Sequence, residues 1–149
     1  MKCFLIMAFI CLAASYTIDY NKIDTQYAYI TNVYTKNDTT FIAADFVQML
    51  TGKQAIKAAQ QKGLADTTYN DDGTKITNIY VANDYIIVNQ QPIVRTFAVA
   101  NNAVFTEENL TNKRAVMSKK IFVKQFKNNL YLLTFKAGIV TNIHKVYLP

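Results

Sequence analysis

The chain has 149 residues, of which 51% are hydrophobic, and a formal net charge of +6. This length and apolar content suit one domain with its own core and exclude a mainly disordered chain. With only two cysteines and one histidine, a disulfide-rich framework and the usual cysteine and histidine zinc sites are excluded, and no cofactor is expected.

The first 15 residues have the layout of a secretory signal peptide. Lys2 is the positive residue, residues 4–12 form an apolar run, and residues 13–15 have the small side chains of a cleavage site. The apolar run is too short to span a bilayer, which takes roughly 20 residues. We therefore expect cleavage near Ser15, a secreted or periplasmic protein, and a single globular domain over residues 16–149.

Both cysteines lie within this first segment, at Cys3 and Cys11, so the mature domain is expected to contain no cysteine. Small exported eukaryotic domains usually rely on disulfides, and their absence here favours a bacterial exported protein. A lipid anchor on Cys11 is disfavoured because the bulky residues Phe9 and Ile10 precede it, where a bacterial lipobox has small residues.

The first part of the mature chain reads as a leader followed by two strands. Residues 16–26 are polar without clear periodicity and predict a loose leader. Residues 27–34 and 40–50 are rich in β-branched and aromatic side chains and predict strands around a turn at 36–38. Asp45 lies among apolar neighbours in the second of these strands.

A short helix is predicted over residues 52–62. Thr51 and Gln54 have the spacing of a capping box, and Gly63 falls where a left-handed C-cap belongs. The polar residues 64–75 predict a loop with an Asn, Asp and Gly turn. They lack the spaced oxygen ligands of a calcium loop.

Three more strands are predicted over residues 76–82, 85–89 and 93–99, before a polar loop at 107–114. Arg95 interrupts an apolar face of the third strand, as Asp45 does in an earlier one. Because buried charges generally need partners, we predict a structural ion pair between Asp45 and Arg95.

The C-terminal third predicts a helix and a hairpin. Ser118 is the expected cap of a helix through Asn128. Its predicted inward side chains are Ile121, Phe122, Gln125 and Phe126, and its predicted outward ones are Lys120, Lys124 and Lys127. Residues 130–136 and 139–148 predict a hairpin across Ala137 and Gly138.

These elements predict an α+β fold that is mainly β. We expect about six strands in antiparallel hairpins together with two short helices. A small, partly closed barrel is one arrangement of such strands.

Several segments together resemble a group of small exported bacterial proteins and lipoproteins of unknown function. They are residues 46–52 (FVQMLTG), 83–89 (NDYIIVN), 95–99 (RTFAV), 138–143 (GIVTNI) and 147–149 (YLP). The group's pattern has a tryptophan where this chain has Leu132, and an acidic pair where it has His144 and Lys145. The resemblance implies export and a shared fold, and it implies no activity.

The charge of the chain is concentrated near its C-terminus. Residues 101–149 contain eight Lys or Arg and only two Asp or Glu. The candidate binding residues are Lys113, Arg114, Lys120, Lys124 and Lys127. This basic face favours an anionic partner, either a lipid, a glycan or another protein, although lysines on a solvated face give the same pattern. The predicted export disfavours nucleic acid.

The sequence offers little chemistry for catalysis. His144 has no neighbouring nucleophile motif and is expected at the surface or half-buried. The sequence therefore favours an exported, non-enzymatic binding or accessory domain in a bacterial envelope. The alternative is a small exported hydrolase that uses carboxylates near Asp45 or Asp84.

Overall fold

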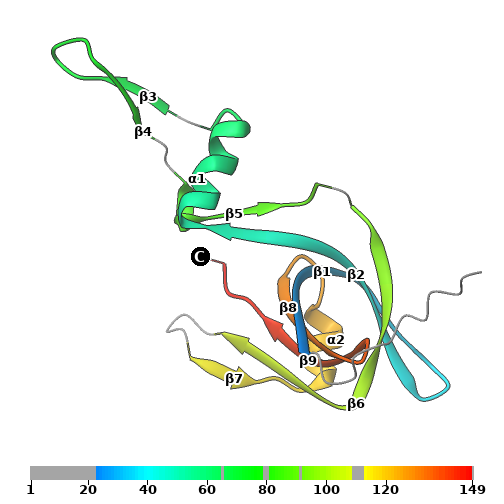
Figure 1. Cartoon of the computed structure of the whole chain (residues 1–149). Helices are drawn as coiled ribbons and strands as arrows, with labels where there is room; N and C mark the ends of the chain where they lie inside the picture. Colours follow the sequence, from blue (N-terminus) through cyan, green and yellow to red (C-terminus); the bar gives the residue numbers. More distant parts are fainter. Residues whose placement is uncertain (1–22, 65, 79–80, 91, 109–112, 149) are drawn as a thin grey trace, which may run out of the picture.

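The computed structural model describes residues 23–64, 66–78, 81–90, 92–108 and 113–148. The predicted signal peptide, with both cysteines, lies outside these residues, as does the predicted leader up to residue 22. Figure 1 shows the whole chain. The elements in chain order are β1 (Ile23–Lys36), β2 (Thr39–Thr51), α1 (Gly52–Gln61), β3 (Asp66–Tyr69), β4 (Lys75–Asn78), the 3-10 turn η1 (Ala82–Asp84), β5 (Tyr85–Val88), β6 (Val94–Glu108), β7 (Arg114–Val116), α2 (Lys119–Gln125), β8 (Leu130–Lys136) and β9 (Ile139–Lys145).

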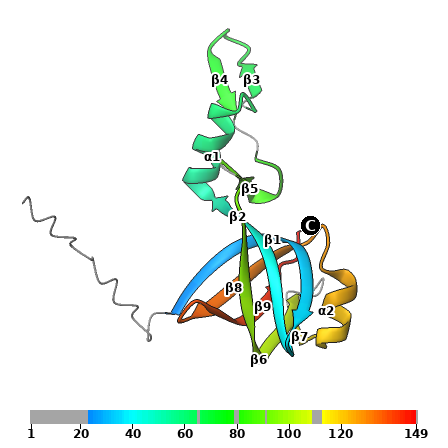
Figure 2. The same ribbon diagram turned by 90° about the vertical axis from the view of Figure 1, so that its right-hand side faces the viewer.

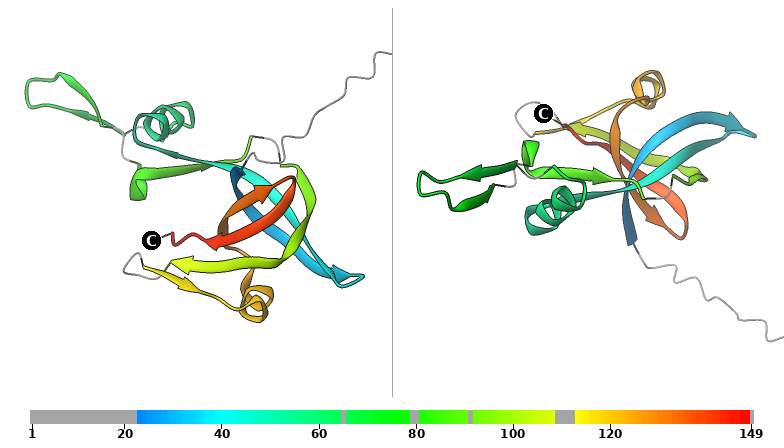
Figure 3. Two further views of the ribbon diagram at one scale, coloured as in Figure 1. Left: turned by 60° about the horizontal axis from the view of Figure 1, so that its bottom comes forward. Right: turned by 90° about the horizontal axis from the view of Figure 1, so that it is seen from above.

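Five strands form a closed barrel in the order β1-β2-β6-β9-β8, with β8 pairing back onto β1. The β6–β9 pair is parallel and the other barrel pairs are antiparallel. Helix α2 lies between the third and fourth barrel strands and sits against one end of the ring (Figures 1 and 3). This strand order, with one parallel pair and a helix at that point, is the topology of the OB-fold, a five-stranded Greek-key barrel.

The predicted fold class is confirmed, since the chain is α+β and mainly β. The parallel β6–β9 pair was not expected, because the sequence predicted only antiparallel hairpins. Alternate residues of the barrel strands point inward and form the core. Its least exposed members include Ala28, Ile42, Ala44, Leu133, Val140 and Ile143, each 0% exposed.

The segment between β2 and β6 projects away from the barrel (Figure 2). Strand β5 pairs with the far end of β2, from Gln48 opposite Val88 to Thr51 opposite Tyr85. Helix α1 has a buried small-residue face formed by Ala55, Ala58 and Ala59. This projecting arm lengthens the connection between the second and third barrel strands and leaves the ring itself uninterrupted.

Both ends of α1 lie where the sequence predicted them, but the hydrogen bonding at its N-terminus differs from the prediction. Thr51 is the N-cap residue, yet its side chain makes no capping hydrogen bond, so the predicted capping box is wrong. Gly63 is left-handed with φ of +68°, as predicted. The Leu64 N–H donates to the Ala59 carbonyl at 2.9 Å, which closes the helix with a Schellman motif.

Three segments are more ordered than the sequence predicted. Residues 23–26 belong to β1, where they pair with β8, instead of forming a leader. The predicted loop over 64–75 contains half of the β3–β4 hairpin. Glu107 and Glu108 extend β6, because β9 on one side and β7 on the other satisfy their backbone groups.

The β8–β9 turn is as predicted, but it places a strained residue at its first position. Ala137 has φ of +51° and Gly138 has φ of +76°, so both are left-handed, as a two-residue type I′ turn requires. The left-handed conformation is unfavourable for alanine because of its Cβ, whereas asparagine tolerates it. We expect Ala137→Asn to raise the free energy of unfolding by about 1 kcal/mol in urea titrations. Ala137→Val is the control and should lower it; a loss of stability in both variants would contradict this account of the turn.

Candidate functional site

Helix α2 is held on the barrel end by a cap and a buried aromatic side chain. The Ile121 N–H donates to the Ser118 hydroxyl at 3.3 Å, which confirms Ser118 as the N-cap. Phe122 is 0% exposed, and its ring lies 5.1 Å from that of Phe105 and 5.7 Å from that of Tyr131. These contacts fix which face of the helix points to solvent.

The outward face of α2 is basic. Lys120, Lys124 and Lys127 are all exposed, as predicted. Lys120 and Lys124 lie on one stripe of the helix, whereas Lys127 follows it, because α2 ends at Gln125 and not at the predicted Asn128. Lys113 and Arg114 are exposed on the segment that leads into it. These five residues are called the basic surface below. Lys119 is not part of it, because its ammonium group donates a hydrogen bond to the hydroxyl of Thr40.

Two side chains predicted to face inward are instead exposed. Ile121 is 45% exposed and Gln125 is also at the surface, so this part of the helix prediction is wrong. The helix is short, and the barrel end accommodates only Phe122 and, beyond the last turn, Phe126. Val123 is 41% exposed as well. Aliphatic side chains therefore flank the lysines on the outward face.

The predicted ion pair between Asp45 and Arg95 is wrong. Both residues lie in the described part of the chain, and Arg95 is opposite Ala44 while Asp45 is opposite Val94. Neighbouring positions on a strand point to opposite faces of the sheet, so the two side chains diverge.

Each of these two residues has a different partner. The Asp45 carboxylate accepts from the Asn89 side-chain amide at 2.7 Å and from the Ile93 N–H at 3.1 Å. The Arg95 guanidinium lies 5.6 Å from the centre of the Phe46 ring. Asp45 thus fastens the end of the projecting arm to the barrel.

His144 is buried, against expectation, within a polar row on the outer face of β6 and β9. It is 4% exposed, its Nδ1 lies 2.8 Å from the Thr106 hydroxyl, and its Nε2 lies 3.3 Å from a Glu108 carboxylate oxygen. Because a carboxylate only accepts, Nε2 carries a proton and donates it to Glu108, while the Thr106 hydroxyl is the partner of Nδ1. The row of a hydroxyl, an imidazole and a carboxylate, from Thr106, His144 and Glu108, matches the order of groups in a hydrolase triad. Because the His144 ring is buried, it has little access to a substrate.

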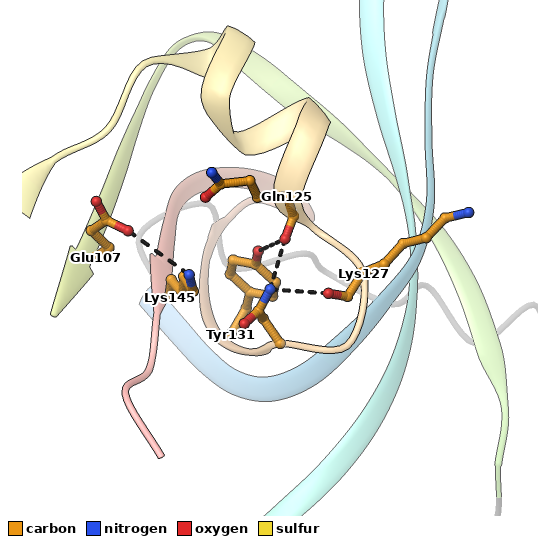
Figure 4. Close-up of polar contacts among 6 residues, drawn as sticks. Glu107, Gln125, Lys127, Tyr131 and Lys145 are labelled. Atoms are coloured by element: carbon orange, nitrogen blue, oxygen red, sulfur yellow. Dashed lines mark hydrogen bonds and ion pairs between the residues drawn. The ribbon is translucent and has the colours of Figure 1, made fainter. Parts of the chain in front are cut away.

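The inner side of the same barrel end surrounds Tyr131 (Figure 4). Its hydroxyl reaches toward the Gln125 carbonyl at 3.5 Å, and burial raises its pKa to about 12. Lys145 and Glu107 lie beside it, with 3.9 Å between the ammonium nitrogen and the nearest carboxylate oxygen. The end of β6 therefore carries two adjacent carboxylates, one on each face of the sheet.

A cleft of about 320 Å³ opens at this end, between the start of β8 and the C-terminal tail. Glu108 and Lys145 line it together with Asn129, Leu130, Val146 and Tyr147. The sequence did not predict this site, because Glu107 and Glu108 were assigned to a loop. A second cleft, of about 200 Å³, lies on the projecting arm and is lined by Asp84 and the start of α1.

The described residues contain no group of three or more histidine, cysteine, aspartate or glutamate side chains that could hold a metal ion. Within the same residues, no helix is long and apolar enough to cross a membrane. The barrel topology and a basic, partly aliphatic helix define a small β-barrel domain with a candidate binding surface. No family model, no curated protein and no solved structure matches the chain.

Proposed function

We propose that this chain is an exported, non-enzymatic binding domain that attaches to anionic lipid surfaces through its basic surface. The observation that carries the proposal is the outward face of α2, where Lys120 and Lys124 are exposed, flanked by the half-exposed side chains of Ile121 and Val123, with the exposed Lys127 just beyond the helix end. Lysines attract anionic headgroups, and the aliphatic side chains that flank them gain from entering the interfacial region of a bilayer.

The rest of the molecule supports a scaffold role for the barrel. The buried contacts of Phe122 seat α2 on the barrel end, so the exposed lysines of the helix face solvent. The signal-like first 15 residues and the resemblance to small exported bacterial proteins favour an envelope location. A glycan or an acidic protein is the other kind of anionic partner, and the test below separates them from lipid.

The test compares the wild type with the triple variant Lys120→Gln, Lys124→Gln and Lys127→Gln. Each lysine near a charged membrane contributes about 1 kcal/mol, so the variant should bind anionic vesicles roughly 100-fold more weakly. Binding of the wild type should also weaken steeply with salt, since exposed charges are screened beyond about 10 Å at 0.1 M. Vesicle co-sedimentation at several salt concentrations measures both the loss of affinity in the variant and the salt dependence of wild-type binding.

The matched control removes three exposed lysines from the other helix region, through Lys53→Gln, Lys57→Gln and Lys62→Gln. It changes the net charge equally and should keep most of the binding. Equal losses in both triple variants would mean that only net charge matters, and the basic surface would then be a solubilising face. Binding to a soluble polyanion such as heparin without binding to vesicles would contradict the lipid assignment.

A further inference from the structure

Strand β2 has an unpaired edge where it leaves the barrel for the projecting arm. Its barrel part pairs with β1 on one side and with β6 on the other. The pairing with β1 ends at Val47, whereas residues 48–51 pair with β5, on the side of β2 away from β1. Within the described ranges, no strand therefore pairs with the β1 side of residues 48–51.

An unpaired edge presents backbone N–H and C=O groups that can receive another strand. One such group already has a substitute partner, because the Gln26 side-chain amide donates to the Val47 carbonyl at 2.9 Å, just where the β1 pairing ends. Backbone groups alternate between the two sides of a strand, so those of Met49 point to the same side as the Val47 carbonyl. Met49 is therefore the position at which an added strand would form its hydrogen bonds.

A groove of about 430 Å³ lies between this part of β2 and α1. Its size is within the range of natural ligand sites, about 300–1,000 Å³. The lining consists of alternate residues of β2 and of one stripe of α1, which share a face by their spacing. They are Gln48, Leu50, Gln54, Lys57, Ala58 and Gln61. The unpaired edge and the groove thus belong to the same stretch of β2.

The groove combines an apolar floor with amide groups and a positive charge. The apolar lining residues, Leu50 and Ala58, are half-buried and buried, and the polar ones are exposed. The glutamine side chains offer both donors and acceptors, which suit the peptide groups of a second chain. Lys57 is the one charged residue of the lining, so the groove favours a ligand that carries a carboxylate.

We propose that this edge and groove bind an extended, acidic segment of another protein by strand addition. The backbone of the segment pairs with β2 at Met49, and one of its carboxylates pairs with the ammonium group of Lys57. Strand addition to an exposed sheet edge is a common way to bind extended peptides, with side-chain contacts giving the specificity. None of the groove residues belongs to the basic surface, so this site is independent of the proposed function.

The probe is the peptide acetyl-SVEVEVS-amide, which is acidic and favours an extended backbone. One control replaces both glutamates by glutamine, and a second keeps them but has N-methyl groups on all interior residues, so that its backbone cannot donate. Titration followed by amide chemical shifts should give saturable changes for the acidic peptide at residues 48–51 and 54–61. The uncharged peptide should bind about threefold more weakly, as expected for an exposed ion pair. The N-methylated peptide should give no saturable change.

Two variants of α1 test the charge. Lys57→Gln should weaken binding of the acidic peptide about threefold and leave binding of the uncharged peptide unchanged. Lys53→Gln is the matched control, because it removes the same charge from an exposed position of α1 outside the groove. It should bind both peptides as the wild type does.

The proposal is overturned if the acidic peptide gives no saturable changes at β2 and α1, or if the N-methylated peptide binds as tightly. A similar loss in Lys53→Gln and Lys57→Gln would contradict the role of Lys57 in the groove. Changes at residues 48–51 that grow with protein concentration in the absence of peptide would assign the edge to a second copy of the chain, which would also contradict the proposal.

Discussion

Phe122→Ala should lower the free energy of unfolding by about 3–5 kcal/mol, the range for removing a buried aromatic side chain. Phe122 is 0% exposed and joins α2 to the barrel through the rings of Phe105 and Tyr131. The cavity left behind lies under the helix, so the midpoint of thermal unfolding should fall by about 10 °C or more.

Ile121→Ala is the matched control for that experiment, because it shortens the neighbouring side chain on the exposed side of the same helix. We expect it to cost about 1 kcal/mol or less, since Ile121 is 45% exposed. Calorimetry or urea titration measures both variants. Similar losses for the two would mean that α2 is seated differently, and the orientation of the basic surface would then be wrong.

Tyr131 should make the wild type sensitive to alkali. Burial raises the pKa of Tyr131 from 10.0 to about 12, so the folded chain holds this proton more tightly than the unfolded chain does. The resulting stability is fully present below pH 10 and is lost as the pH rises through 12. Two pKa units correspond to about 2–3 kcal/mol of unfolding free energy.

The measurement is urea unfolding of the wild type and of Tyr131→Phe at pH 8 and at pH 11.5. The wild type should lose more stability than Tyr131→Phe between these values. Tyr147→Phe removes a tyrosine that is 38% exposed and should follow the wild type. If the wild type and Tyr131→Phe lost stability in parallel, the burial of this phenol would not control alkaline unfolding.

Local signals in the sequence were sufficient for some turns and helix ends, but not for the capping box at Thr51 or for the end of α2, which lies at Gln125 and not at Asn128. Ser118 as a cap and Gly63 as a left-handed residue were predicted at the correct positions, because such features depend on a few neighbouring residues. The tight turn between β8 and β9 was predicted for the same reason. The mainly β character followed from strand composition alone.

Register between distant strands was not predictable in this way. Asp45 and Arg95 each interrupt an apolar run, which was a reason to predict that they pair. In the β2–β6 register, Arg95 lies opposite Ala44 and not opposite Asp45. An offset of one residue turns a side chain to the other face of the sheet, so Asp45 and Arg95 point to opposite faces. Nothing local to either residue encodes that offset.

The cleft and the buried histidine were missed for a related reason. They depend on the parallel pairing of β6 with β9, which places Thr106 opposite His144 across a separation of 38 residues. Thr106, Glu107 and Glu108 are three consecutive polar residues, so the end of β6 lacks the alternation of apolar and polar residues that predicts a strand. The two adjacent glutamates therefore indicated a loop.

The most direct test of the proposed function is to map where an anionic lipid contacts the folded domain. Amide chemical shifts would be followed while short-chain phosphatidylglycerol is added below its micelle concentration, with short-chain phosphatidylcholine as the neutral control. We predict that the anionic lipid perturbs residues 113–127 and that the neutral lipid does so far more weakly. Equal responses to the two lipids, or changes confined to helix α1 on the projecting arm, would contradict the account.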